Sequence, residues 1–287
     1  MIDVPARLTA WYLVTAGILG LVVGSFLNVV IYRLPRMLET RWRRDCAELG
    51  GAATETGPVF NLAYPGSHCP RCAHPIPPWA NVPVLSWMLL RGRCHFCHQA
   101  ISVRYPLVEL AAGIGAFLCA LGFDHPLQAI GAMVLVWMLI ALALIDFDHQ
   151  VLPDSITLPG LWLGLVLNSF DTFVTLRSAL WGAIAGYLFL WAVYQAFRLL
   201  TGKEGLGYGD FKLLALLGAW LGAMSLVLII LAASAIGALT GIGLIATGRH
   251  KREEPLPFGP FLAGAGILAL AFGPHLIALW LTGLHAS

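Results

Sequence analysis

The stretch "AWYLVTAGILGLVVGSFLNVVIYRLPR" (residues 10–36) decides the fold class. It contains no charged residue from Ala10 to Ile31, and Arg33 and Arg36 follow. A helix needs about 20 apolar residues to cross a hydrocarbon core of about 30 Å. The run is too long for the apolar part of a signal peptide, and it is followed by arginine where a signal peptide would have a small-residue cleavage site. We therefore expect a first membrane-spanning helix that stays attached to the chain.

The rest of the chain has the same apolar character. Of its 287 residues, 59% are hydrophobic and 11% are charged, and the mean hydropathy is +0.80. These values exclude an ordinary soluble globular domain and predict an all-α polytopic membrane protein with about eight transmembrane helices. The expected spans are residues 10–31, 105–123, 127–146, 155–170, 177–197, 210–223, 225–247 and 258–283.

One polar block, residues 33–104, differs from everything around it. It is the only segment of the sequence that indicates a separate domain. We therefore expect three parts, which are a first transmembrane helix (1–32), a loop domain (33–104) and a transmembrane core (105–287).

The distribution of basic residues predicts the orientation in the membrane. Lys and Arg gather in cytoplasmic loops, and 15 of the 17 basic residues fall on one side if eight spans are assumed. That side comprises residues 32–104, 147–154, 198–212 and 248–257. Only Arg7 and Arg177 lie on the other side. We expect a cytoplasmic loop domain and both termini outside the cytoplasm. The net charge of +2 gives no reason to expect a nucleic-acid partner.

Four of the six cysteines form two C-x-x-C pairs, "CPRC" (69–72) and "CHFC" (94–97). Two such pairs at this separation are typical of a tetrahedral zinc site, with Cys69, Cys72, Cys94 and Cys97 as ligands. Disulfide and redox roles are the alternatives, and a reducing cytoplasm disfavours them. A site closed by four thiolates has no open position for a substrate, so we expect the zinc to be structural.

Four aspartates are weighed as members of a site: Asp146, Asp148, Asp154 and Asp210. Glu109, in the first turns of the span 105–123, is either an interfacial salt-bridge partner or a functional polar group. Carboxylates in or at the edge of a membrane are costly and are functional candidates. Asp154 follows a proline and precedes an apolar run, so it is expected to cap a helix. The topology places Asp146 and Asp210 at the same membrane edge, although spacing alone does not separate Asp146 from Asp148.

Two carboxylates brought close together share a proton. One can then act as a base toward water while the other acts as an acid toward a carbonyl, which is aspartic protease chemistry. Gly207 and Gly209 precede Asp210 and would let a substrate backbone approach closely. The alternative is that "GLGYG" is only a flexible loop with Asp210 as the cap of the next helix. Four stretches rich in small residues predict close helix packing: "GAIAG" (182–186), "GALTG" (237–241), "GIGLIA" (241–246) and "GAGILA" (264–269).

Several segments together resemble the bacterial type IV prepilin peptidases, in order along nearly the whole chain. They are "GSFLNVVIYRLP" (24–35), the two C-x-x-C pairs, "RYPLVEL" (104–110), "IDFDHQVLPD" (145–154), "TGKEGLGYGDFKLLALLGAWLG" (201–222) and "PLPFGPFLA" (255–263). In that family a GxGD motif supplies one catalytic aspartate and the first aspartate of the ID-x-D segment supplies the other. The resemblance therefore implies that Asp210 and Asp146 are the catalytic pair.

The resemblance implies a bifunctional enzyme of the bacterial cytoplasmic membrane. Such enzymes cut the basic leader of prepilins and pseudopilins, the precursors used in type IV pili and type II secretion, after a glycine. They then methylate the new N-terminal residue with S-adenosylmethionine. For the methyl donor the resemblance points to the loop domain, where Gly92 and Arg93 of "RGRC" are candidates; the family often has Lys at the latter position, and Arg binds with a different geometry.

Three other functions are compatible with parts of the pattern. A peptidase without methyltransferase activity is the nearest alternative, and the complete four-cysteine loop favours the bifunctional form. A proton-coupled transporter would place its charges near the middle of the membrane and show inverted repeats. A membrane-anchored zinc-binding module would need no paired aspartates.

Overall fold

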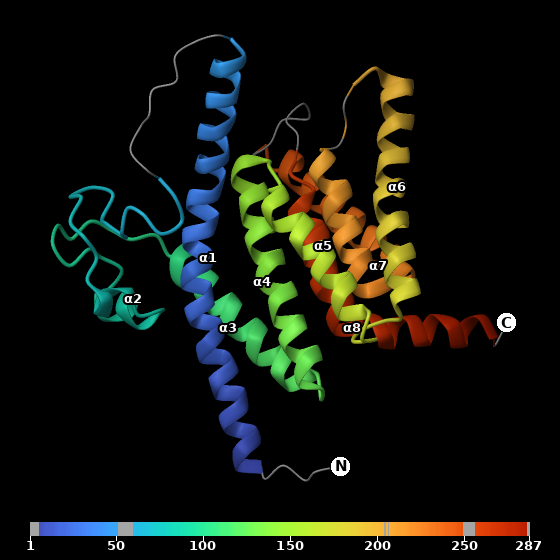
Figure 1. The fold of residues 1–287 in the computed structure, drawn as a ribbon, viewed down its shortest axis with the longest axis horizontal. Helices are drawn as coiled ribbons and strands as arrows, with labels where there is room; N and C mark the ends of the chain where they lie inside the picture. The colour runs from blue at the N-terminus through green and yellow to red at the C-terminus, as the bar shows by residue number, and fades with distance from the viewer. Residues whose placement is uncertain (1–5, 51–59, 204, 206, 249–255, 286–287) are drawn as a thin grey trace. The chain divides into compact units, whose positions relative to one another are not determined.

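The computed structural model describes residues 6–50, 60–203, 205, 207–248 and 256–285. Within these ranges the chain is helical, apart from turns and two isolated bridges. It divides into two compact units, Met1–Asp124 and His125–Ser287, and each is described separately (Figure 1).

In the first unit, a long helix packs against a shorter one. Helix α1 spans Ala6–Leu49 and helix α3 spans Arg104–Gly122. Small residues let the two backbones approach closely, since a Cβ at Gly24 would lie 2.6 Å from the Cα of Glu109. Along the chain, the segment that connects α1 to α3 contains a short 3-10 helix, η1 (Pro78–Asn81), and helix α2 (Leu85–Leu89).

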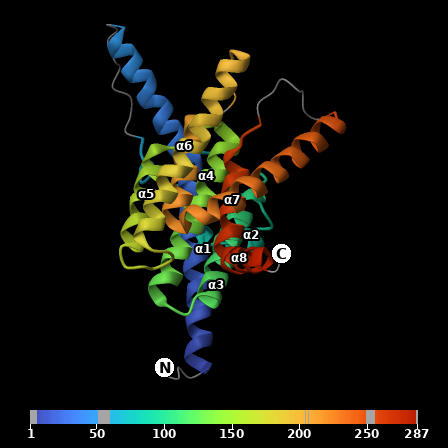
Figure 2. The same ribbon diagram turned by 90° about the vertical axis from the view of Figure 1, so that its right-hand side faces the viewer.

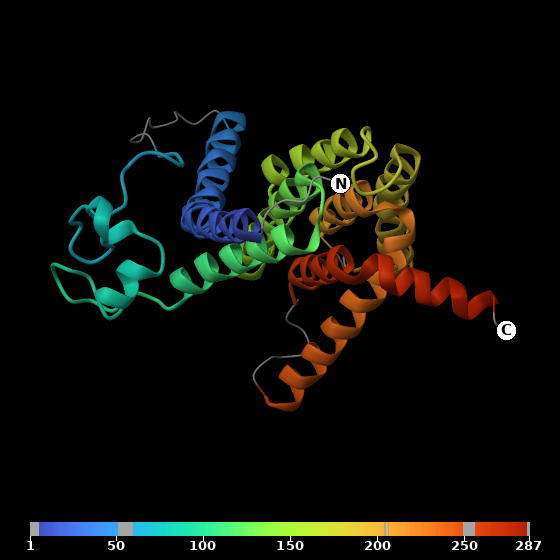
Figure 3. The ribbon, with the colours of Figure 1, turned by 90° about the horizontal axis from the view of Figure 1, so that it is seen from below.

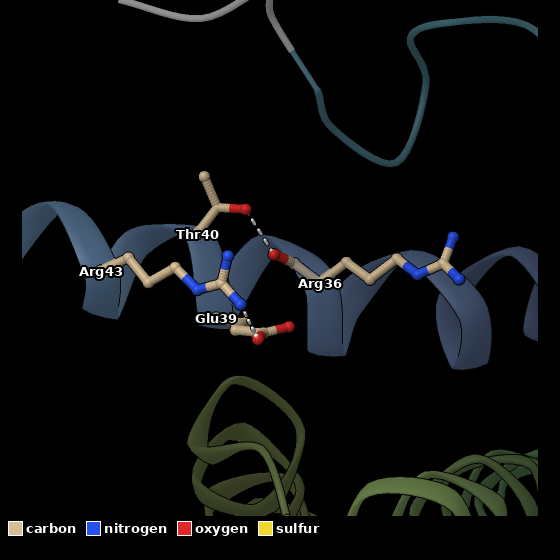
Figure 4. A network of polar contacts seen from close by, with 4 residues as sticks. All are labelled: Arg36, Glu39, Thr40 and Arg43. Carbon is tan, nitrogen blue, oxygen red and sulfur yellow. Dashed lines mark hydrogen bonds and ion pairs between the residues drawn. The ribbon is translucent and has the colours of Figure 1, made fainter. Parts of the chain in front are cut away.

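Helix α1 continues well beyond its apolar run. A span of 10–31 was expected, but the helix passes through Pro35 and ends at Leu49. Its last part, from Arg36 on, is mostly polar and exposed, with an ion pair between Arg43 and Glu39 (2.5 Å) and a hydrogen bond from the Thr40 hydroxyl to the Arg36 carbonyl (Figure 4). Part of the segment expected in the loop domain is therefore an extension of the first span.

The second unit consists of five helices. They are α4 (Pro126–His149), α5 (Asp154–Asn168), α6 (Leu176–Thr201), α7 (Tyr208–Ala246) and α8 (Gly259–His285). Helix α7 contacts α5, α6 and α8, and α8 also packs against α4 (Figures 1 and 2). The close packing predicted for "GAIAG" is confirmed, because a Cβ at Gly182 would lie 2.3 Å from the carbonyl oxygen of Gly218 on α7. The same prediction is only partly correct for "GIGLIA" and "GAGILA", because a Cβ at Gly243 or Gly264 would meet nothing within 4 Å.

Helix α7 contains two helical segments separated at Gly222, whose φ of 80° and ψ of 171° are not helical. The bend is visible where the orange ribbon changes direction in Figure 3. Asn168 stabilises this break, because its amide nitrogen donates to the carbonyls of Ala219 (2.8 Å) and Trp220 (3.0 Å). The sequence predicted two spans here, 210–223 and 225–247, and the break lies close to their boundary.

The predicted helical membrane architecture is confirmed. Among the described residues, five helices are long and apolar enough to cross a membrane, namely α1, α3, α4, α6 and α7, and the part of α8 from Gly259 to Gly273 is apolar but shorter. The predicted number of eight spans is not confirmed. The chain is a multi-pass membrane protein.

Candidate active site and cysteine cluster

Asp146 lies near the C-terminal end of α4. That helix ends because Gln150 adopts a left-handed conformation (φ 53°) and its N–H donates to the Asp146 carbonyl (2.8 Å), an αL cap. The carboxylate itself is buried, and its Oδ2 accepts a hydrogen bond of 3.0 Å from the backbone N–H of Gly259, the first residue of α8.

Asp210 lies in the first turn of α7. Its carboxylate is also buried, and its Oδ2 accepts from the N–H of Gly207, the N-cap residue of that helix, at 3.3 Å. The other oxygen, Oδ1, is buried and has no hydrogen-bond partner among the described residues. Buried polar atoms are nearly always paired, so an oxygen left unpaired is available to a reacting group.

The two carboxylates lie in one compact unit. Asp146 is close enough to Asp210 for the charges of the two side chains to interact. They come from α4 and α7, two helices that both pack against α8 (Figure 1). The structure thus brings together the two aspartates that the sequence singled out. Their catalytic role remains a prediction.

Gly207 and Gly209 differ in their surroundings. Gly207 has an extended conformation, with φ of −80° and ψ of 144°. Gly209 lies within α7, where a Cβ would come within 2.7 Å of the Leu152 side chain. Packing on Leu152 is therefore sufficient reason for a glycine at position 209. An approach of substrate along these glycines remains a prediction.

Asp154 does not cap a helix, contrary to the sequence-based expectation. Pro153 is the N-cap of α5 and no side chain caps it. Instead, Asp154 Oδ1 accepts from the ammonium group of Lys212 at 2.6 Å. Lys212 lies two positions after Asp210, so the pair joins the start of α5 to the first turn of α7.

Sequence reasoning missed Gly259. The segment "PLPFGPFLA" contributed to the family resemblance, but no role was assigned to its glycine. The backbone N–H of Gly259 binds Asp146, and a Cβ at this position would lie 2.6 Å from Asp146 Oδ2. The only signal in the sequence was a glycine placed just before an apolar run.

The cysteine cluster lies in the first unit. Each sulfur of Cys69, Cys72, Cys94 and Cys97 lies within 4.8 Å of the others, and all four thiols are free. The sulfurs of Cys69 and Cys97 are 3.7 Å apart, which is near the value of about 3.8 Å that a tetrahedral zinc with bonds of about 2.3 Å requires. The four side chains fit a metal ion.

The surroundings of Cys69 favour the thiolate form that binds metals. Hydrogen bonds from the backbone of Cys72 and then of Arg71 lower the pKa of the Cys69 thiol to about 6. Backbone N–H groups in a tight turn commonly stabilise a thiolate in this way. The pKa of the Cys72 thiol is instead raised to about 11: a backbone hydrogen bond at His74 lowers it, but burial and the neighbouring sulfurs of Cys69, Cys97 and Cys94 raise it by more. The fit to a metal therefore depends on the four donor atoms and their positions.

The two candidate residues for the methyl donor lie beside the second cysteine pair. Gly92 is buried with φ of 64°, and a Cβ there would lie 2.8 Å from the Trp87 ring. Packing against Trp87 and the positive φ are therefore sufficient reasons for a glycine. Arg93 is exposed. Their assignment to the methyl donor remains a prediction.

Comparison with known proteins gives a consistent result over most of the chain. Residues 18–123 match the Bacterial Peptidase A24 N-terminal domain, and residues 133–242 match the Type IV leader peptidase family. The chain is 51% identical to a prepilin leader peptidase/N-methyltransferase of Stutzerimonas stutzeri, over 94% of each chain. A protein of the same name from Pseudomonas putida is 50% identical, over 94% of this chain and 93% of the relative. Another, from Burkholderia pseudomallei (strain 1026b), is 51% identical, over 92% of this chain and 87% of the relative. No solved structure matches the chain.

Proposed function

We propose, from the premise that the chain belongs to the type IV leader peptidase family, that it is a membrane aspartic endopeptidase which removes the leader of prepilins and pseudopilins. The observation that carries this proposal is the pair of buried carboxylates on α4 and α7, one of which has an unpaired oxygen. The names of the relatives support the same substrate class.

The arrangement allows acid-base hydrolysis by Asp146 and Asp210. One carboxylate removes a proton from water as the water oxygen attacks the scissile carbonyl carbon, and the other donates a proton toward the carbonyl oxygen. The peptide C–N bond then breaks and the leaving amine takes up a proton. The hydrogen bonds from Gly259 and Gly207 hold one oxygen of each carboxylate in place, which leaves the other oxygens for the reaction.

The position of the pair fits a leader peptide whose basic part remains in the cytoplasm. The bias of Lys and Arg predicts a cytoplasmic loop domain and periplasmic termini, with Asp146 and Asp210 at the cytoplasmic edge. A basic leader followed by an apolar helix is held in the inner membrane in the same orientation, so its junction reaches that edge.

The decisive experiment measures prepilin cleavage by purified Asp146→Asn and Asp210→Asn enzymes. Each change preserves size and part of the hydrogen bonding, so we expect cleavage to be nearly abolished while the protein remains folded. The double variant should be little worse than either single one, because residues that act as a unit are not additive. Asp148→Asn is the matched control on α4 and should retain activity. Near wild-type turnover in either variant of the pair would refute the proposal.

We also propose that the enzyme methylates the new N-terminus with S-adenosylmethionine. The relatives carry this activity in their names, and the complete four-cysteine cluster favours it over a peptidase alone. Purified enzyme incubated with a prepilin and labelled S-adenosylmethionine should transfer label to the mature chain. Cleavage of the prepilin without transfer of label would support the peptidase activity and exclude the methyltransferase activity.

Zinc is the metal that we propose for the cysteine cluster. Two C-x-x-C pairs whose four thiolates lie together are the usual ligand set of structural zinc sites, which are closed to substrate. When bound, the metal supplies folding energy to the loop. The chain's own part is to hold Cys69 and Cys97 at the required separation.

A further inference from the structure

The segment of residues 75–90, "PIPPWANVPVLSWMLL", contains no charged residue although it belongs to the polar loop domain. It carries η1 and α2. Several of its large apolar side chains are exposed, with exposed fractions of 52% for Trp79, 59% for Leu85, 62% for Met88 and 82% for Leu89. An exposed apolar patch of this kind marks a surface that contacts a partner or a membrane.

The level of the segment along the spans is fixed by Glu109. This buried residue of α3 accepts a 2.7 Å hydrogen bond from the backbone N–H of Val84, at the start of α2. Ser25 on α1 also lies within hydrogen-bond reach of the Glu109 carboxylate. Val84 is therefore level with Ser25, which lies inside the apolar run of α1 (Ala10–Ile31).

The depth can be worked out from the helix rise of about 1.5 Å per residue. Ser25 precedes Ile31 by six residues, or about 9 Å, and Glu109 follows Arg104 by five, or about 7.5 Å. In Figure 1, α2 lies at about the level of the middle of α1, well below the C-terminal end of that helix. Interfacial helices lie about 5–10 Å into the boundary between headgroups and acyl chains, so the depth of α2 matches that boundary.

Side chains at the same level on α1 already face outward. Val22 and Phe26 are 54% and 53% exposed, as expected for surfaces that lipid covers in a membrane helix. The exposed side of α2 holds Leu85, Met88 and Leu89, whereas Trp87 points inward and donates from its ring nitrogen to the carbonyl of Ile101 (3.2 Å).

The backbone of the segment also suits a non-aqueous setting. Polar backbone groups near lipid must be satisfied within the protein. The segment has four prolines, which lack an N–H, and the Val84 N–H is paired with Glu109. The next charged residue along the chain is Arg91, directly after the apolar segment. Trp79 is of the residue type that favours the membrane interface.

We propose that the segment of residues 75–90 lies in the headgroup and acyl boundary of the membrane and anchors the loop domain to the same bilayer that α1 and α3 cross. The occupant of the exposed face of α2 is lipid. The cysteine cluster is thereby held against the membrane surface, on the side where the apolar run of α1 ends and Arg33 follows.

The test uses full-length protein in vesicles of phosphatidylethanolamine and phosphatidylglycerol. The photoreactive residue benzoylphenylalanine replaces Leu89, and mass spectrometry detects lipid adducts after irradiation. Leu19, exposed within the apolar run of α1, is the positive control, and Leu49, 90% exposed at the polar end of the same helix, is the negative control. We expect lipid adducts at positions 89 and 19 and none at position 49.

Absence of lipid adducts at position 89, as at position 49, overturns the proposal. Crosslinking of position 89 to a co-reconstituted prepilin in place of lipid also overturns it and assigns the face to substrate. A second readout is tryptic cleavage after Arg91, which should become several-fold faster in a Leu85→Glu, Leu89→Glu double variant and stay unchanged in Leu49→Glu. If the double variant fails to fold, the single photoreactive replacement in otherwise wild-type protein still decides the matter.

Discussion

Gly259→Ala should impair cleavage through its effect on the Asp146 carboxylate alone. The added Cβ would lie 2.6 Å from Asp146 Oδ2 and 3.0 Å from its Cγ, far closer than carbon atoms approach other side chains. Either the carboxylate rotates or the start of α8 shifts, and both break the 3.0 Å hydrogen bond from the Gly259 N–H. A hydrogen bond to a charged group contributes about 1.5–3 kcal/mol.

Loss of that contribution predicts a decrease in kcat of about 10- to 150-fold. A displacement of about 1 Å in a catalytic group has a similar effect. The matched control is Gly264→Ala on the same helix, where a Cβ would meet nothing within 4 Å. We expect wild-type cleavage in this control.

The assay is steady-state cleavage of a prepilin by purified enzyme in detergent, with thermal unfolding measured in parallel. Label transfer from S-adenosylmethionine to an already mature pilin provides a second readout. This transfer should be unchanged in Gly259→Ala, because the methyl donor is expected to bind in the loop domain, which the substitution does not alter. Wild-type kcat in Gly259→Ala would refute the assignment of this backbone N–H to the positioning of Asp146. Equal loss of both activities would indicate general misfolding instead.

Three further predictions concern the metal, the ion pair and the topology. Purified protein should contain about one zinc ion per chain. In a Cys69→Ser, Cys72→Ser double variant the zinc should be lost, and the loop domain should unfold at a lower temperature than in the wild type. Full zinc content in that variant would contradict the four-cysteine site. Asp154→Asn should lower the free energy of unfolding by under about 1 kcal/mol, because its partly exposed pair with Lys212 is solvent-screened, and measurable cleavage should remain; loss of all cleavage would assign Asp154 a catalytic part. A reporter enzyme that is active only in the periplasm should be active when fused after Ser287. Activity of a reporter that works only in the cytoplasm, fused at the same place, would contradict the predicted orientation in the membrane.

Local sequence carried most of the information about the spans and the cysteine cluster. Uncharged runs of membrane length are sufficient to predict helices, and the C-x-x-C spacing predicts four converging sulfurs, since each tight turn supplies two. The extension of α1 to Leu49 was not predicted. Beyond Arg33 the segment is rich in charged residues and was assigned to the polar loop, although Leu34, Leu38 and Trp42 recur at helical spacing. Local contacts such as the ion pair between Glu39 and Arg43 also stabilise this part of the helix.

Contacts between residues far apart in the sequence were beyond sequence reasoning. The partner of Asp154 is Lys212, on another helix, so a carboxylate after a proline was expected to cap a helix and does not. Likewise, the Gly259 N–H binds an aspartate on α4, and only the packing of α8 on α4 brings the two together. A single chain without its relatives provides no signal for such pairs.

The candidate active site is built from three helix ends. Asp146 lies at the C-terminal end of α4, where the partial charge of the helix disfavours an anion. The first N–H groups of α8 compensate for this, because Gly259 donates to its carboxylate, and the start of α7 provides the same for Asp210 through Gly207. Each carboxylate therefore depends on the N-terminal end of a helix for its position. A small shift of α7 or α8 would disturb these hydrogen bonds without altering either aspartate, so changes at the two glycines should impair cleavage if Asp146 and Asp210 act as proposed.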